Sequence, residues 1–317
     1  MKNIWIAASL ASLLALAPGA SAQQKPIRVL VTLAAGGSLD ATTRLFAERL
    51  HESLGQPVIV ENRAGASGRI AMEALKAAPA DGSVLMASAS GSITLLPNTF
   101  KTPPFDPNRD FAPVAQMAEV AFALTVNAGV PARTAPEFAA LAKADPAFRS
   151  IGSTPRSNTN LLAWGFARAA DVPVVHVPYK GNGQAILDLI GGRISGAFLA
   201  IGEALQQRGS GKLRVLATTG VRRSSLMPDM PTLKESGYDV EGSAWFALFA
   251  PAGTPPATVE RLSRAVVEAA ASPELRERLA HAGVETAPLS SKELAAKIRV
   301  EYQDIGRALR ASGFQPD

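Results

Sequence analysis

Two segments of this 317-residue chain carry residue types that bind small anions. The first follows a short apolar run and leads into a helical pattern, and it contains Ala35, Gly36, Gly37, Ser38 and Asp40. Glycines let the backbone approach a ligand closely, and free N–H groups at a helix start favour an anion. Ser38 is suited to capping the helix, and Asp40 to its first turn. The alternative is an ordinary strand-to-helix turn with a capping residue.

The second segment spans residues 152–160 and also lies between an apolar run and a helical pattern. It is rich in hydroxyl and amide groups and carries one guanidinium. Its candidate ligand-binding residues are Ser153, Thr154, Arg156, Ser157, Asn158, Thr159 and Asn160. Two such loops, one in each half of the chain, would face each other and hold the two ends of a small anion. The alternative is a solvated loop, since Ser and Asn are common in turns.

A third strand-to-helix turn contains Lys180 and Gly181. Lys180 would add positive charge near the same ligand, or it would simply point into solvent. The sequence is compatible with both interpretations. Lys180 and Gly181 are included among the candidate ligand contacts.

Motifs for catalysis or metal binding are missing. The three histidines, His51, His176 and His281, are far apart, and no zinc-binding His spacing occurs. The chain has no Cys, which excludes disulfides and thiolate chemistry. It also lacks a nucleophile elbow, a Ser-x-x-Lys pair, a dinucleotide-binding glycine motif and a P-loop. We therefore expect a binding protein without cofactor or metal, with His176 as a structural residue. A triad assembled from distant residues is the alternative.

The elements that must position these loops are read from the apolar pattern. Short β-rich runs alternate with helical patterns, which predicts an α/β fold with parallel sheets covered by helices. A first series has strands at 27–33, 57–61 and 83–88 and helices at 38–54 and 67–78. After an irregular, Pro-rich stretch at 97–113, a second series has strands at 120–126, 148–152, 172–177, 193–199 and 213–218, and helices at 134–143, 158–170 and 184–190.

The chain then returns to the first series. A strand at 245–249 is followed by helices without a sheet of their own, so these helices are expected to pack back on the first sheet. This predicts a discontinuous first domain, residues 23–122 plus 246–317, and an inserted second domain, residues 123–245. Two crossings between domains form a hinge, and the cleft between such domains is a common ligand site.

The first 22 residues are typical of a secretory signal peptide. Lys2 precedes an apolar run at 4–16, and small residues at 20–22 suit cleavage. A membrane anchor is the alternative, but the run is shorter than the roughly 20 residues that span a bilayer. No other stretch is long enough, so we expect an exported, periplasmic monomer that is not embedded in the membrane. The net charge of +5 is spread along the chain and gives no nucleic-acid-binding run; it suits anion steering or solubility.

A series of motifs stands in order along the chain: AAGG at 34–37, LGQPVIVENR at 54–63, FDP at 105–107, HVPYKG at 176–181, DLIGG at 188–192, LMPDMPT at 226–232 and APAGTP at 250–255. With these motifs the sequence resembles the Bordetella uptake gene (Bug) family, the extracytoplasmic solute receptors of tripartite tricarboxylate transporters.

The resemblance implies a type II periplasmic-binding fold, with two hinged α/β domains around a cleft. It implies a small carboxylate ligand: a di- or tricarboxylate, an acidic amino acid or an aromatic acid. The ligand would be held by residues 35–40 and 153–160, with Lys180 and Gly181 nearby. Two integral-membrane components would complete a transporter. Presentation of the ligand to a sensor protein is the alternative.

The sequence also departs from the family pattern. Residues 155–157 replace the usual Gly-Asn-Gly stretch, and Leu161 stands where a His is usual. Ser195 and Leu199 stand where Asp is usual. Fewer acidic groups, together with Arg156, predict a cleft that is less negative than in relatives.

We predict that Arg156 contacts a fully ionised carboxylate of the ligand, because an Arg–carboxylate pair can be bidentate and strong. An Arg156→Ala variant should then bind the cognate acid more weakly in isothermal titration calorimetry. Unchanged binding would mean that Arg156 points away from the ligand and that Pro155 merely stiffens the loop.

Overall fold

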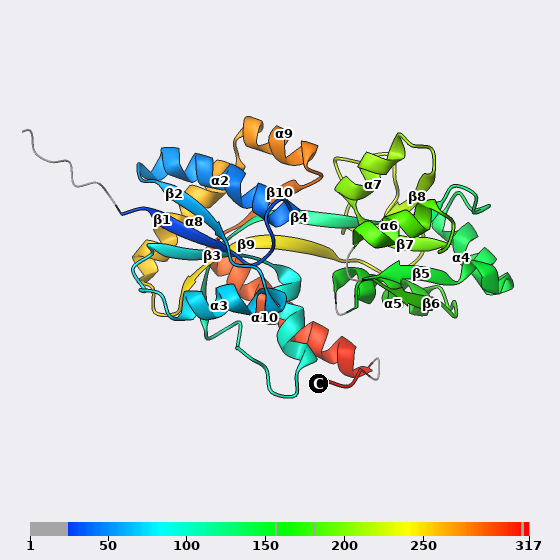
Figure 1. The fold of residues 1–317 in the computed structure, drawn as a ribbon, viewed down its shortest axis with the longest axis horizontal. Coiled ribbons are helices and arrows are strands. Elements are labelled where there is room, and N and C mark those ends of the chain that lie inside the picture. The colour runs from blue at the N-terminus through cyan, green and yellow to red at the C-terminus, as the bar shows by residue number, and fades with distance from the viewer. Residues whose placement is uncertain (1–24, 156, 180–181, 312–313, 317) are drawn as a thin grey trace, which may run out of the picture.

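Two lobes, joined by two long strands, make up the computed structural model (Figure 1). It describes residues 25–155, 157–179, 182–311 and 314–316. The predicted signal peptide and the candidate residues Arg156, Lys180 and Gly181 lie outside this part of the chain. The connecting strands are β4 (Phe111–Asn127) and β9 (Ser243–Pro251).

The first lobe is built around a parallel sheet in the order β2-β1-β3. Its strands are β1 (Ile27–Val31), β2 (Val58–Asn62) and β3 (Val84–Ala89), with the connecting helices α2 (Ser38–Leu54) and α3 (Arg69–Lys76). Leu39, Phe46 and Leu50 of α2 are buried in its core because they recur at helical spacing. Gly55, at φ 68°, ends α2 in the left-handed conformation that glycine adopts without strain.

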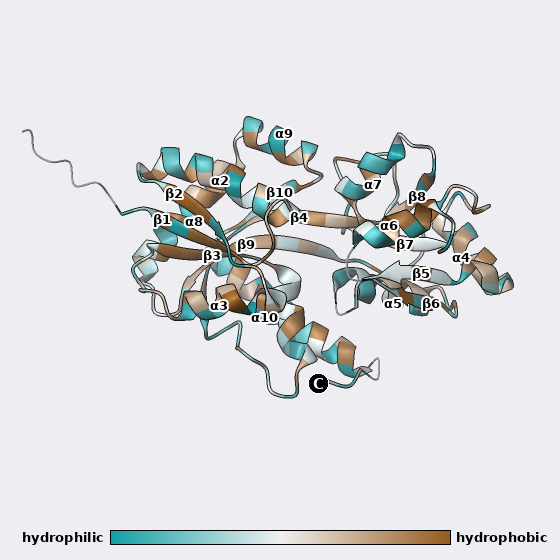
Figure 2. Cartoon of the chain, in the orientation of Figure 1, coloured by the Kyte–Doolittle hydropathy of each residue, from teal (hydrophilic) through white to brown (hydrophobic). Residues whose placement is uncertain are grey.

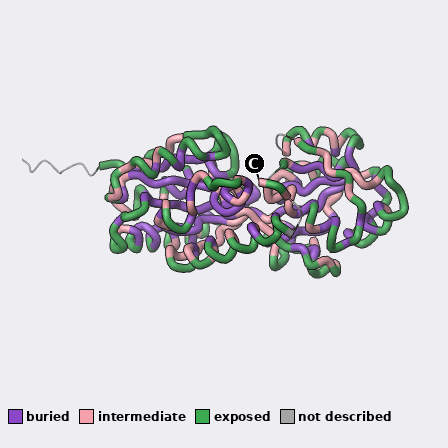
Figure 3. Tube along the Cα trace, turned by 90° about the horizontal axis from the view of Figure 1, so that it is seen from below, coloured by how far each residue is buried: buried purple, intermediate pink, exposed green. Residues whose placement is uncertain are grey.

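The second lobe repeats this pattern. β5 pairs in parallel with β6 and with β7, and Phe138, Phe166 and Phe198 lie in a separate core. The elements are α4 (Ala135–Ala144), β5 (Ser150–Ser153), α5 (Asn158–Ala169), β6 (Val175–Pro178), α6 (Asn182–Ile190), β7 (Gly196–Ala200), α7 (Ile201–Arg208) and β8 (Leu213–Thr218). Buried residues fill the interior of both lobes (Figure 3).

The strand β4 belongs to both lobes. Its first part, from Phe111 to Ala121, pairs antiparallel with β9 in the first lobe. From Phe122 onward it pairs antiparallel with β7, and from Ala123 also with β8, in the second lobe. The chain therefore crosses between the lobes inside a continuous strand. The domain boundaries at 122–123 and 245–246 stay a prediction.

The C-terminal helices pack on the first lobe. They are α8 (Pro256–Ala270), α9 (Pro273–His281) and α10 (Ser291–Ala311). Leu262 and Val266 of α8 share a core with β1 and β4, and Leu294 and Ile298 of α10 pack below β3 and β9. Figure 2 shows hydrophobic residues along β1 and β3 and hydrophilic ones on the outer faces of α2 and α9.

The expectation of parallel sheets is correct only for β2-β1-β3 and β6-β5-β7. Each lobe has a mixed sheet, because β4, β8, β9 and β10 pair antiparallel. The stretch 97–113 is not wholly irregular, since β4 begins at Phe111. The strand β10 (Glu285–Leu289), missed in the sequence, pairs with β4. Its residues are all of intermediate burial, so it lacks the apolar run that marks a buried strand.

Candidate ligand-binding site

The candidate loops follow the carboxyl ends of the parallel strands. Residues 32–37 follow β1, and residues 154–157 follow β5. Open α/β sheets bind ligands beyond these ends. The two lobes also touch there: Asn158, at the start of α5, donates through its Nδ2 to Ser90 Oγ (3.3 Å) and to the Ser243 carbonyl (3.4 Å). Ser90 follows β3, so the second candidate loop faces the strand ends of the first lobe.

In the first loop, Asp40 holds the backbone in place. Its side chain is buried and accepts hydrogen bonds from Gly36 N–H (2.9 Å), Arg44 Nε (3.0 Å) and Asn62 Nδ2 (3.0 Å). Burial by itself raises the pKa of Asp40, but these hydrogen bonds and the Arg44 charge outweigh it and leave the pKa below its usual value. Asp40 therefore shapes the loop.

The rest of this loop is open. Ala35, Gly36, Gly37 and Ser38 are exposed. The N-cap of α2 is Gly37 and no side chain caps it, so the expectation that Ser38 caps the helix is wrong. A Cβ built on Gly36, whose φ is 83°, would meet no atom within 4 Å. Uncapped N–H groups beside open space suit a bound anion.

The second loop is organised by its own hydroxyls. Ser157 is the N-cap of α5 and accepts from Asn160 N–H (3.4 Å), while its Oγ–H donates to the Thr154 carbonyl (2.6 Å). Thr159 Oγ1 lies 2.8 Å from Ser157 Oγ and accepts from Thr154 N–H (3.4 Å). These bonds hold Thr154, Ser157 and Thr159 in place at the start of α5.

His176 supports this loop from β6. Its Nε2 is hydrogen-bonded to Ser153 Oγ and lies 3.1 Å from Asn160 Nδ2. Burial lowers the pKa of His176, which favours the neutral ring that can accept these bonds. The sequence-based assignment of His176 as structural missed this link, because its partners Ser153 and Asn160 are 23 and 16 residues away.

The Ser153–His176 pair differs from a catalytic triad. Ser153 is 1% exposed, so its hydroxyl is out of reach of a substrate. Both partners of the ring lie on Nε2, whereas a triad needs the nucleophile on one ring nitrogen and the orienting group on the other. This geometry suits a scaffold.

The residues on either side of the third turn, Tyr179 and Asn182, lie in the described part of the chain. Tyr179 donates to Asp188 Oδ2 (2.8 Å), and burial together with this carboxylate raises the pKa of Tyr179 to about 12. Asn182 Nδ2 donates to Glu203 Oε2 (2.7 Å). Burial raises the pKa of Glu203. Glu203, the partner of Asn182, is an acidic group that sequence reasoning missed, since nothing in its local sequence marks it.

The family departure at Ser195 does not alter the cleft. Ser195 N–H donates to Ser150 Oγ (2.9 Å), at the opposite end of β5 from the candidate loop. Leu199 is fully buried in a core with Ala123 and Ile194. The expectation that Ser195 makes the cleft less negative is therefore wrong, because the residue lies just before β7 and beside the start of β5, away from the candidate loops.

Two cavities border the connecting strands β4 and β9, with volumes of about 630 and 670 Å³. Asn158 is the only candidate residue in the described part of the chain that lines either of them.

Among the described residues, no cluster of His, Cys, Asp or Glu is arranged to hold a metal ion. No described helix has the length and apolar character to cross a membrane.

Comparison with known proteins identifies relatives over almost the whole chain. Residues 42–314 match the family model described as tripartite tricarboxylate transporter family receptor. A UPF0065 protein in the gbd 5' region of Cupriavidus necator is 36% identical over 298 residues, covering 92% of this chain and 90% of that protein. BugT of Bordetella pertussis is 32% identical over 300 residues, covering 91% and 90%.

Solved structures of similar proteins also match almost the whole chain. The periplasmic binding protein BugD superposes with a TM-score of 0.77 at 28% identity, covering 92% of this chain and 99% of BugD. MatC from Rhodopseudomonas palustris with bound malate gives 0.74 at 27%, covering 90% and 98%. Rpa4515 of R. palustris with adipate gives 0.80 at 28%, covering 92% and 98%. The chain belongs to the tripartite tricarboxylate transporter receptor family, whose members include the Bug proteins.

Proposed function

We propose that this protein captures a small carboxylate between its lobes for a tripartite tricarboxylate-type transporter. The observation that carries the proposal is the contact of Asn158 with Ser90, which brings the start of α5 to the strand ends of the first lobe. Near these strand ends lies the uncapped start of α2.

The proposed ligand class follows from the backbone N–H groups that no side chain caps. The start of α2 offers backbone N–H groups and the positive end of a helix dipole. The relatives MatC and Rpa4515 hold malate and adipate, both of which are dicarboxylates. A ligand with two separated carboxylates would place one on each lobe.

The proposed contacts fall into two groups. Asp40, Ser153, Thr159 and Asn160 shape the loops through their hydrogen bonds. The residues proposed to touch the ligand are Ala35, Gly36, Gly37, Ser38, Thr154, Arg156, Ser157, Asn158, Lys180 and Gly181.

We infer the location and the partners from membership of the family. The segment 1–22, interpreted as a cleaved signal peptide, would deliver the protein to the periplasm. Two integral-membrane components would take the ligand from the receptor. A ligand-dependent pull-down from solubilised membranes tests this partnership against presentation to a sensor protein.

A thermal-shift screen of the mature chain against a carboxylate library should raise the melting temperature with the cognate acid. Ligand at 100 times its Kd stabilises the folded state by about 2.7 kcal/mol. A dicarboxylate is expected to give the largest shift. A shift by a sugar or a cation, with none by any carboxylate, would contradict the proposed ligand class.

An Asp40→Asn variant should bind the acid found in that screen several-fold more weakly in calorimetry, because an amide replaces the carboxylate that accepts from Gly36 and Arg44. The matched control is Asp171→Asn, whose parent side chain is 97% exposed. Equal affinity in the two variants would show that the first loop does not depend on Asp40.

Stability should fall on acidification because of His176. A folded-state pKa below the unfolded value makes the unfolded chain bind more protons, so stability is present above a pH of about 6.5 and lost below it. The melting temperature of wild type should therefore drop more between pH 7.5 and 5 than that of His176→Gln. His51→Gln, which changes an exposed histidine, is the control. If the melting temperatures of wild type and His176→Gln fall equally between pH 7.5 and 5, the assignment of a neutral His176 ring is wrong.

A further inference from the structure

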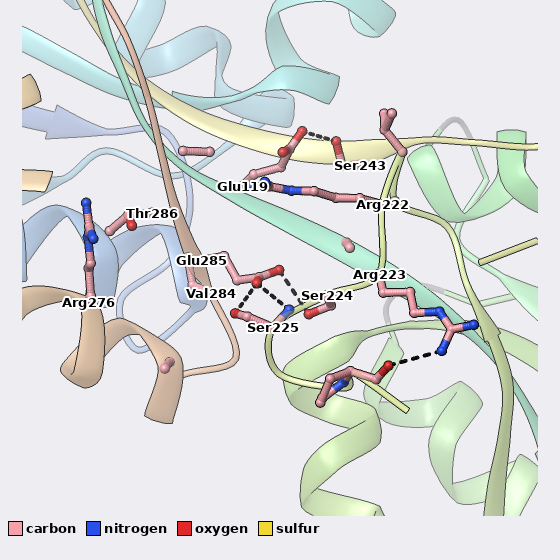
Figure 4. A pocket seen from close by; sticks show the side chains of 16 residues that line it. Glu119, Arg222, Arg223, Ser224, Ser225, Ser243, Arg276, Val284, Glu285 and Thr286 are labelled. Atoms are coloured by element: carbon pink, nitrogen blue, oxygen red, sulfur yellow. Dashed lines mark hydrogen bonds between the residues drawn. The ribbon is translucent and has the colours of Figure 1, made fainter. Parts of the chain in front are cut away.

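We propose that the cavity shown in Figure 4 is a second anion-binding site that takes a small, doubly charged oxyanion. We call it the hinge cavity. It has a volume of about 630 Å³ and is lined by parts of β4, β9, α9 and β10 and by segment 220–228. None of its lining residues belongs to the candidate ligand loops 35–40 and 153–160.

Both lobes contribute to the hinge cavity. Arg276 and Glu285 come from α9 and β10 of the first lobe, and Arg222 comes from the segment after β8. Met227 anchors that segment in the core of the second lobe. A ligand that contacts both arginines would therefore bridge the lobes.

The lobes are already in close contact beside the hinge cavity. Glu285 accepts hydrogen bonds from Ser224 Oγ (2.9 Å), Ser225 N–H (2.8 Å) and Ser225 Oγ, as Figure 4 shows. A Cβ built on Gly283 would lie 2.0 Å from Gly202 Cα, so the two backbones touch. The wall of the cavity is thus fixed by direct interactions between the lobes.

The acidic groups of the hinge cavity are engaged. Glu285 is held by the two serines, and Glu119 accepts from Ser243 Oγ and lies 3.6 Å from Lys297 Nζ. Hydrogen bonds from neutral donors keep Glu285 in its charged form, whereas the charge of Glu119 is offset by Lys297.

Two cationic groups remain available. Arg223 pairs with Glu235 (2.9 Å), but Arg222 and Arg276 have no carboxylate within 4.0 Å among the described residues. Arg276 Nε donates to the Ala270 carbonyl (3.0 Å), which anchors its guanidinium and leaves the terminal nitrogens free. Figure 4 shows the Arg222 side chain lying along the cavity toward Glu119.

The expected ligand follows from these groups. Guanidinium groups bind oxyanions through paired N–H donors, and the three arginines that line the cavity outnumber its two glutamates. Because the site draws on both lobes, its occupant would favour the lobe arrangement seen here. It would thereby couple a second anion to capture in the cleft.

The test is calorimetry of the mature chain with inorganic phosphate at about pH 8. Wild type should bind one phosphate, and Arg222→Gln/Arg276→Gln should bind it at least about tenfold more weakly. The control is Arg261→Gln/Arg264→Gln, which removes the same charge from exposed positions of α8 and should retain binding. Asp40→Asn should also retain it.

The proposal is overturned if wild type binds no phosphate, if the control loses binding as far as the hinge-cavity variant does, or if Asp40→Asn abolishes it. The last result would place phosphate in the cleft. The thermal shift by the cognate carboxylate, measured in Arg222→Gln/Arg276→Gln, keeps the two proposals apart. The carboxylate should still raise the melting temperature of this variant. That result tests carboxylate binding in the cleft whether or not phosphate binds in the hinge cavity.

Discussion

The hydrogen-bonding pattern of β4 is the constraint on which the rest of the molecule depends. The strand changes partners between Ala121 and Phe122, from β9 to β7. Strand pairing is directional and regular, so this change sets how the two sheets meet. The candidate loops, the contact of Asn158 with Ser90 and the hinge cavity all lie around the junction that it creates.

The candidate site is organised by buried and half-buried polar groups that hold its loops from behind. Asp40 fixes the glycine-containing loop, and His176 fixes the start of the loop after β5. Buried polar groups with all partners present rigidify their surroundings. In this arrangement, scaffold side chains hold the loops while backbone N–H groups and exposed side chains remain available. An exposed residue such as Pro155 can then be changed without loss of these bonds.

Local patterns were enough to predict much of the fold. The helix at 38–54 has the bounds expected from its apolar face and Gly55, and the loops before α2 and α5 follow from the same reasoning. Contacts between distant residues were not predictable. Ser90 meets Asn158 across 68 positions, and β10 is a half-exposed strand whose pairing with β4 joins residues 166 or more positions apart. Ser195 was misplaced because a motif does not tell which end of a strand a residue occupies.

The pairing of Ala121 with Ser243 has a consequence for protein engineering. The chain enters and leaves the second lobe at two adjacent points on neighbouring antiparallel strands. A segment with adjacent ends can be exchanged with little strain on its host, as insertions of whole domains show. Chimeras that combine this first lobe with the second lobe of a relative would separate the contribution of each half to ligand choice.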